Sequence, residues 1–191
     1  MERMIIQTIS ESEATGAVAK SYAEDRADLG YVPQHTRAMN LNPEALQAFE
    51  QLTGAIARPL GIRRYELVTL AAARGARSVH CLLAHGRKSL NYFDEAQLEL
   101  IALDYRKAGL SDAEVAMMAF AEKVSGAASS MTDVDSQRLR DHGFDDTEIV
   151  NIALAAAARN YYSRAVQALA IDVEELPGLS PALRAALVSG L

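Results

Sequence analysis

Hydrophobic positions along the chain recur at helical spacing, and no stretch alternates between hydrophobic and polar residues as a strand would. Alanine, leucine, glutamate and arginine, which favour helices, are abundant. The pattern therefore predicts an all-α protein. The expected helices span about residues 10–30, 43–57, 62–75, 79–92, 94–108, 111–126, 132–143, 145–170 and 180–190.

Capping residues support several of these boundaries. Ser10 and Glu13 have the spacing of a capping box, which predicts a helix that begins there and ends near Gly30. Asn42 before Pro43 is typical of an N-cap followed by the first helical turn. The last segment, about 177–191, is expected to form a tail helix that is mobile or docked on a partner.

A faint internal repeat relates two of the helical segments. Residues 64–85 align with residues 146–167 at an offset of 82, which places Glu66 on Glu148 and Cys81 on Ser163. We interpret the chain as a single domain over 1–191 with a duplicated two-helix unit. Its motif-bearing half covers about 30–92 and its degenerate half about 94–170. The plainer alternative is two buried helices with small, closely packing faces.

Composition narrows the function classes. The 191 residues suit one domain, the net charge is −6, and no basic stripe is visible, which argues against nucleic acid and against an anionic membrane surface. A single cysteine excludes an internal disulfide and favours a reducing compartment, most simply the cytoplasm. No signal peptide and no apolar run long enough to span a membrane is expected.

The candidate chemistry lies around that cysteine. Gly75 is expected to end one helix and Ser78 to cap the next, which places Cys81 in its first turn. Unpaired amides and the helix dipole favour thiolate over thiol there. His85 is one turn further along on the same face and can exchange a proton with the sulfur. Glu66 could orient His85 if the two helices pack together.

Each of these residues also has a plainer interpretation. A lone cysteine is usually a small buried hydrophobe, and Ser78 has a role as a helix cap in any case. His80 points about 100° away from Cys81 around the helix and is expected at a pocket rim or an interface. A metal site is disfavoured because His80 and His85 are five residues apart and diverge, so we expect no metal and no organic cofactor. His35 lies in a helix that could neighbour the site, but a surface or interface position is favoured, and His142 at a helix end is assigned no function. Tyr161 and Tyr162 could form a wall of the pocket, but buried packing at a helix junction is favoured.

The motif resembles that of the alkylhydroperoxidase D (AhpD-like) and carboxymuconolactone decarboxylase family. It is most similar to the branch called peroxidase-related enzymes. The family motif is Glu, eleven residues, Cys, two residues, Cys, three residues, His, often with a His before the second Cys. Glu66, Ser78, Cys81 and His85 fall at those spacings, and His80 matches the extra His. The similarity covers about residues 30–169, including "GYVPQHTRAMNLNPEALQAF" and "LDYRKAGLSDAEVAMMAFAEKV".

The resemblance implies an AhpD-like helical bundle that assembles as a homo-oligomer, commonly a trimer or a dimer-built hexamer. It implies that Cys81 is the peroxidatic cysteine and that His85 and Glu66 relay protons. The family's resolving cysteine is replaced by Ser78. A peroxidase of this kind would therefore take a small-molecule peroxide and depend on an external thiol reductant.

Two other hypotheses remain open. The first is acid–base catalysis on a small organic acid or lactone, as in the decarboxylases of the family, with His85 and Glu66 active and Cys81 a spectator. Arginines that could hold such an acid are Arg74, Arg77 and Arg87, although each could equally be a surface charge. The second is a non-catalytic helical oligomer that retains the motif by descent.

Overall fold

The computed structural model describes residues 5–191, which form ten α-helices, two 3₁₀-helices and no strand. The prediction of an all-α protein is therefore confirmed. The helices are α1 (Gly16–Leu29), α2 (Gln34–Met39), α3 (Pro43–Leu60), α4 (Ile62–Gly75), α5 (Val79–Ser89), α6 (Glu95–Asp104), α7 (Asp112–Ala127), α8 (Asp133–Asp141), α9 (Asp146–Ala168) and α10 (Pro181–Leu187), with the 3₁₀-helices η1 (Tyr105–Lys107) and η2 (Ala128–Ser130).

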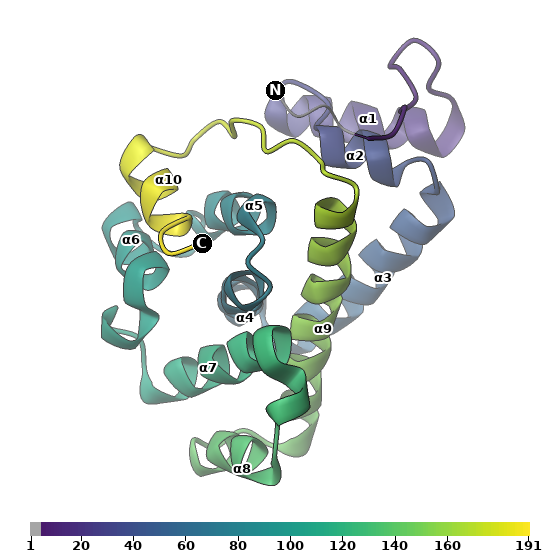
Figure 1. Cartoon of the computed structure of the whole chain (residues 1–191). Coiled ribbons are helices and arrows are strands. Elements are labelled where there is room, and N and C mark those ends of the chain that lie inside the picture. The colour runs from purple at the N-terminus through teal and green to yellow at the C-terminus, as the bar shows by residue number, and fades with distance from the viewer. Residues whose placement is uncertain (1–4) are drawn as a thin grey trace.

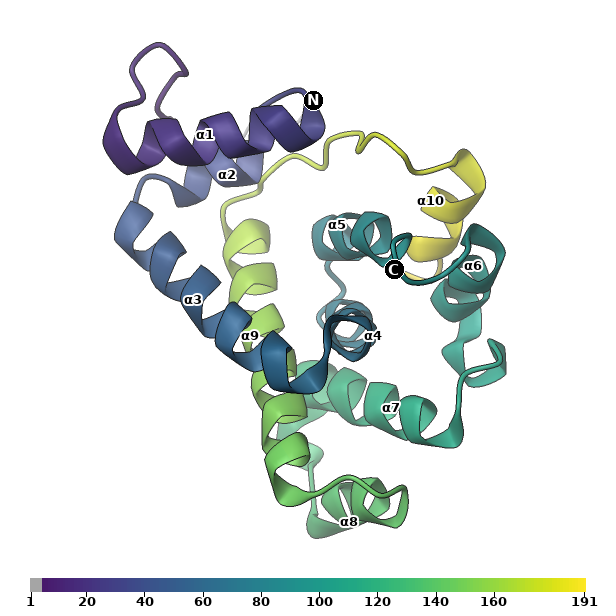
Figure 2. The same cartoon turned by 180° about the vertical axis from the view of Figure 1, so that it is seen from behind.

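Helix α4 forms the centre of the protein. Figures 1 and 2 show it surrounded by α3, α5, α7 and α9. Every residue from Tyr65 to Ala73 is buried, as expected for a helix that is packed on all sides. Glu66 belongs to this run, so the core carries one carboxylate that needs a partner.

Small residues let α4 and α7 approach closely. A Cβ atom added to Gly75 would lie 2.3 Å from the backbone oxygen of Glu122 and 3.0 Å from Cβ of Ser125. The backbone of Gly126 on α7 faces the same point. Gly75 therefore ends α4 and also permits this contact between the two helices.

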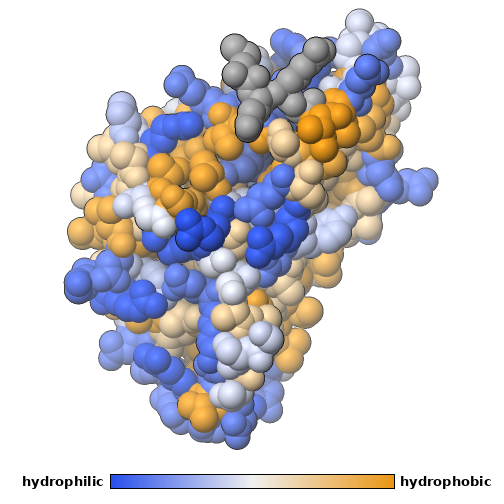
Figure 3. Space-filling view, viewed as in Figure 1, coloured by the Kyte–Doolittle hydropathy of each residue, from blue (hydrophilic) through white to orange (hydrophobic). Residues whose placement is uncertain are grey.

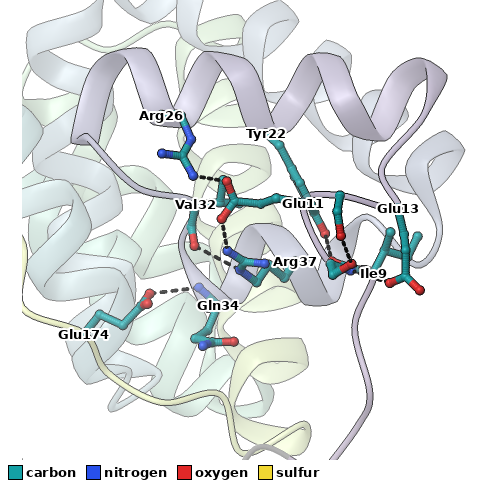
Figure 4. Close-up of polar contacts among 11 residues, drawn as sticks. Ile9, Glu11, Glu13, Tyr22, Arg26, Val32, Gln34, Arg37 and Glu174 are labelled. Atoms are coloured by element: carbon teal, nitrogen blue, oxygen red, sulfur yellow. Dashed lines mark hydrogen bonds and ion pairs between the residues drawn. The ribbon is translucent and has the colours of Figure 1, made fainter.

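Helices α1 and α2 form an N-terminal pair that is fixed by polar contacts (Figure 4). Glu11 forms ion pairs with Arg26 of α1 and with Arg37 of α2, the latter at 2.5 Å. The backbone amide of Gln34 donates to Glu174 at 2.8 Å, which attaches the start of α2 to the segment after α9. Glu11 thus joins α1 to α2, and Glu174 attaches α2 to the rest of the protein.

Two sequence predictions about the ends of the chain are wrong. The amide of Ser10 donates to Glu13 as in a capping box, whereas the amide of Glu13 donates to the backbone carbonyl of Ser10. The pair closes a turn, and α1 begins only at Gly16 before ending near Gly30 as predicted. The tail, expected to be mobile or docked on a partner, packs instead on its own chain, against α5 and α6. Helix α10 buries Leu183 and Leu187, because Gly86 of α5 leaves room for the Leu187 side chain.

The second segment of the proposed repeat folds as a single uninterrupted helix, α9. The first segment is broken into α4 and α5 after Gly75. The equivalent position of Gly75 at the offset of 82 is Ala157, which continues the helix. The duplication itself stays a prediction.

On the face seen in Figure 3, hydrophobic residues occur in small groups between hydrophilic ones. Across residues 5–191, no helix combines the length and the apolar character that crossing a bilayer requires.

Candidate active site

The junction between α4 and α5 places Cys81 in a first helical turn. The amide of Ser78 donates to the carbonyl of Ala73 at 2.9 Å, while Arg77 adopts the left-handed conformation with φ 54°. This hydrogen-bond pattern ends α4. Ser78 then caps α5, because its Oγ accepts from the amide of Cys81 at 3.4 Å. The predicted helix break and cap are therefore both present.

Two side chains of α9 reach the sulfur of Cys81. Ser163 Oγ lies 3.3 Å from Sγ, and Arg159 Nη1 donates to Sγ at 3.7 Å. Burial alone would lower the pKa of Arg159, but the neighbouring Cys81 and Tyr65 raise it above its usual value. The guanidinium therefore stays charged and can stabilise a thiolate at Cys81.

His85 and Glu66 form a buried pair one turn beyond the cysteine. His85 Nδ1 lies 2.6 Å from Glu66 Oε2. Burial, assisted by the nearby Arg159, lowers the pKa of His85 to about 4. Burial would raise the pKa of Glu66, but His85 and the neighbouring cations lower it. A carboxylate only accepts, so Nδ1–H of a neutral imidazole donates to it. Nε2 is then left as a proton acceptor.

A cavity of about 600 Å³ lies over these groups. Cys81 has only 1% of its surface exposed and yet lines the cavity, so reagents must reach the sulfur through it. The walls come from α1, α2, α3, α4, α5 and α9, together with Asn91 and Tyr92 after α5. The residues of the predicted motif that line it are Glu66, His80, Cys81 and His85.

Aromatic rings form a continuous wall of the cavity. The rings of His80 and His35 meet edge to face with centroids 4.5 Å apart. His35 lies 6.2 Å from the ring of Tyr162, which stacks on Phe49 at 5.1 Å. All four line the cavity, whereas Tyr161 is 58% exposed.

The aromatic wall contains two residues for which the sequence favoured other positions. The surface or interface placement of His35 is wrong, because α2 carries this side chain into the cavity. Tyr162, which was expected to pack at a helix junction, also lines the cavity and is a wall residue.

Solved structures share this fold, although no protein-family model matches the chain and no curated protein matches it in sequence. The fold is similar to that of a peroxidase-related protein with an alkylhydroperoxidase AhpD core from Ralstonia eutropha JMP134. The TM-score is 0.79 at 21% identity, over 92% of this chain and 95% of the other.

A second peroxidase-related protein, from Silicibacter sp. TM1040, has a TM-score of 0.74 at 26% identity, over 87% of this chain and 92% of its own. This chain is AhpD-like in fold. The debrominase Bmp8 also shares the fold, with a TM-score of 0.76 at 17% identity over 97% of this chain and 96% of its own. That structure carries a cysteine-to-alanine substitution and contains 2,3,4-tribromopyrrole.

In this AhpD-like chain, sequence reasoning missed the two α9 residues at the sulfur. Arg159 and Ser163 lie outside the motif, 78 and 82 residues after Cys81. The one signal in the sequence was the internal alignment, which placed Cys81 on Ser163. In the structure these two aligned positions contact each other directly.

The three arginines considered for binding an organic acid do not line the cavity of the AhpD-like chain. Arg74 donates to the carbonyl of Ala102, and Arg87 pairs with Asp28 at 3.0 Å. Arg77 is exposed. The arginine that lines the cavity is Arg159.

Within the described part of the chain, no group of three or more His, Cys, Asp or Glu side chains could hold a metal ion.

The buried histidines should make the stability of the AhpD-like fold depend on pH. Burial lowers the pKa of both His80 and His85 to about 4. Their unfolded pKa is near 6.5, so between about pH 6.5 and 4 the unfolded chain binds protons that the folded chain does not. We expect the free energy of unfolding to fall as pH drops through this range, by up to about 1.4 kcal/mol per pH unit for each group.

Denaturant unfolding at several pH values between 7 and 5 measures this slope. His80→Phe keeps a ring beside His35 and should flatten the slope, while His142→Phe at the exposed end of α8 is the matched control. An unchanged slope in His80→Phe would contradict the proposed origin of the pH dependence.

Proposed function

We propose that the protein is a thiol-dependent hydroperoxide reductase that uses Cys81 as its single peroxidatic cysteine. The observation that carries this proposal is the sulfur itself, which lines a cavity and accepts from Arg159 and Ser163. A thiolate is the reactive form of cysteine, and a charged donor beside it stabilises that form.

The first step transfers one oxygen atom to the sulfur. His85 Nε2 takes the thiol proton, and Glu66 stabilises the resulting imidazolium. The thiolate attacks one oxygen of the hydroperoxide, so that an S–O bond forms and the O–O bond breaks. The electron pair of the O–O bond leaves with the alkoxide, which takes the proton from His85. The products are Cys81 sulfenic acid and an alcohol.

The second stage requires thiols from outside the chain. Cys81 is the only cysteine of the sequence, and the motif position that would resolve it is Ser78. One external thiol condenses with the sulfenic acid and releases water, and a second thiol reduces the mixed disulfide. The sum is one hydroperoxide and two thiols converted to one alcohol, one disulfide and one water.

This stoichiometry is the test of the proposed function. With cumene hydroperoxide and an excess of a small monothiol, the protein should form one disulfide for each hydroperoxide consumed. Cys81→Ala should lower the rate to that of the uncatalysed reaction. Turnover that survives in Cys81→Ala would exclude Cys81 as the reacting group and favour acid–base chemistry at His85.

A second candidate is reductive dehalogenation by the same thiolate. Two observations favour it: the cavity is much larger than a small peroxide requires, and a debrominase shares the fold. The thiolate would take the halogen from carbon, a proton would replace it, and two external thiols would restore Cys81 and release halide. The balance is one haloaromatic and two thiols to one dehalogenated aromatic, one disulfide and one hydrogen halide. Bromide release from 2,3,4-tribromopyrrole measures this reaction separately.

A further inference from the structure

The size and the aromatic lining of the cavity suit a ligand that contains a ring. Its volume of about 600 Å³ is in the range of pockets that hold drug-sized ligands. The wall formed by His80, His35, Tyr162 and Phe49 offers a run of ring faces and edges against which a planar group can stack. Hydrogen peroxide would leave nearly all of this surface unused.

A polar group in the same wall lacks a partner. Nδ1 of His35 is fully buried, and no residue of the described chain accepts from it or donates to it. Burial, together with nearby His80, lowers the pKa of His35 well below its usual range. The neutral ring can donate or accept one hydrogen bond. Because buried polar atoms are nearly always paired, an unpaired nitrogen in a residue that lines the cavity is a candidate partner for a ligand oxygen.

The lining outside the wall disfavours anions. Glu24 and Asp25 of α1 and Glu50 of α3 line the cavity, against Lys88 of α5. A lysine on the same helix, Lys20, lies 3.8 Å from Glu24 and offsets part of its charge. Burial, with the nearby Glu24 and Asp25, raises the pKa of Glu50. An anionic ligand would meet the same repulsion. The positive charge at the base of the cavity, on Arg159, is already engaged by Cys81.

We propose, building on the hydroperoxide reductase function above, that the substrates are uncharged aromatic hydroperoxides. The ring packs against the wall of His80, His35, Tyr162 and Phe49, and an oxygen of the substrate hydrogen-bonds to His35 Nδ1. The carboxylates at Glu24, Asp25 and Glu50 reject substrates that carry a carboxylate of their own. His35 is thus assigned a substrate-positioning role that the sequence motif does not contain.

Protection of Cys81 against iodoacetamide tests this assignment without any turnover. The ligand is 2-phenylpropan-2-ol, the alcohol product of cumene hydroperoxide. We expect it to slow labelling, whereas tert-butanol, which lacks the ring, and 2-methyl-2-phenylpropanoate, in which a carboxylate replaces the hydroxyl group, should protect about tenfold less well. Glu50→Gln should improve protection by the carboxylate, while Glu44→Gln, an exposed position on the same helix, should not.

The role of His35 is tested in the same assay. His35→Phe keeps a ring in the wall and removes Nδ1, so the apparent affinity for 2-phenylpropan-2-ol should fall about three- to tenfold. His142→Phe makes the same substitution at an exposed site and should change nothing. Equal protection by all three ligands, or an unchanged affinity in His35→Phe, would overturn the inference even if peroxide is consumed. Selective protection in a protein that consumes no peroxide would support the cavity assignment and refute the proposed function.

Discussion

Replacing Arg159 with methionine is expected to slow the reaction of Cys81 with hydroperoxide about 10- to 100-fold. Arg159 Nη1 donates to the sulfur, and a hydrogen bond to a charged group contributes about 1.5–3 kcal/mol. The guanidinium also places a positive charge beside the sulfur, which favours the thiolate over the thiol.

The measurement is the iodoacetamide labelling rate at pH 7 together with kcat/KM for cumene hydroperoxide. Arg164→Met removes an arginine from the same helix, where it contacts the carbonyl of Ala76 and Gln167 and does not line the cavity, and should leave both values unchanged. Arg159→Lys keeps the charge without the guanidinium geometry, so its labelling rate and kcat/KM should lie between those of Arg159→Met and Arg164→Met. If Arg159→Met labels at the wild-type rate, the thiolate does not depend on Arg159.

Capping residues predicted the start of a helix correctly where the helix begins directly after the cap. Asn42 caps the helix that begins at Pro43, as predicted, and its Oδ1 accepts from the amide of Ala45. The prediction at Ser10 was wrong for a physical reason. Its amide donates to Glu13 as the spacing predicts, but the amide of Glu13 donates to the Ser10 carbonyl and closes a turn, and α1 starts only at Gly16. A capping pattern specifies a turn, and the residues after that turn decide whether a helix begins.

The parts of the site that lie close in sequence could also be predicted. Ser78, Cys81 and His85 share one helix and its cap, so helical periodicity alone places them. The position of Glu66 beside His85 depends on the packing of α4 against α5, and only the spacing of the motif indicated that position. Their catalytic roles stay predictions.

The α9 and α2 residues could not be placed from sequence because only tertiary packing brings them to the cavity. Arg159 and Ser163 reach Cys81 across the contact between α9 and the motif helices. Glu11 joins α1 to α2, and Glu174 attaches the start of α2, which carries His35, to the segment after α9 (Figure 4). Ion pairs and hydrogen bonds between residues far apart in the chain leave no periodic signal in a single sequence.

Oxidation of Cys81 itself tests the central claim most directly. The protein is treated with near-stoichiometric cumene hydroperoxide in the presence of dimedone, and the peptide that contains Cys81 is examined by mass spectrometry. We predict nearly complete conversion to the dimedone adduct of a sulfenic acid, and no adduct anywhere in Cys81→Ala. A Cys81 that keeps its free thiol while hydroperoxide remains in solution would contradict the account.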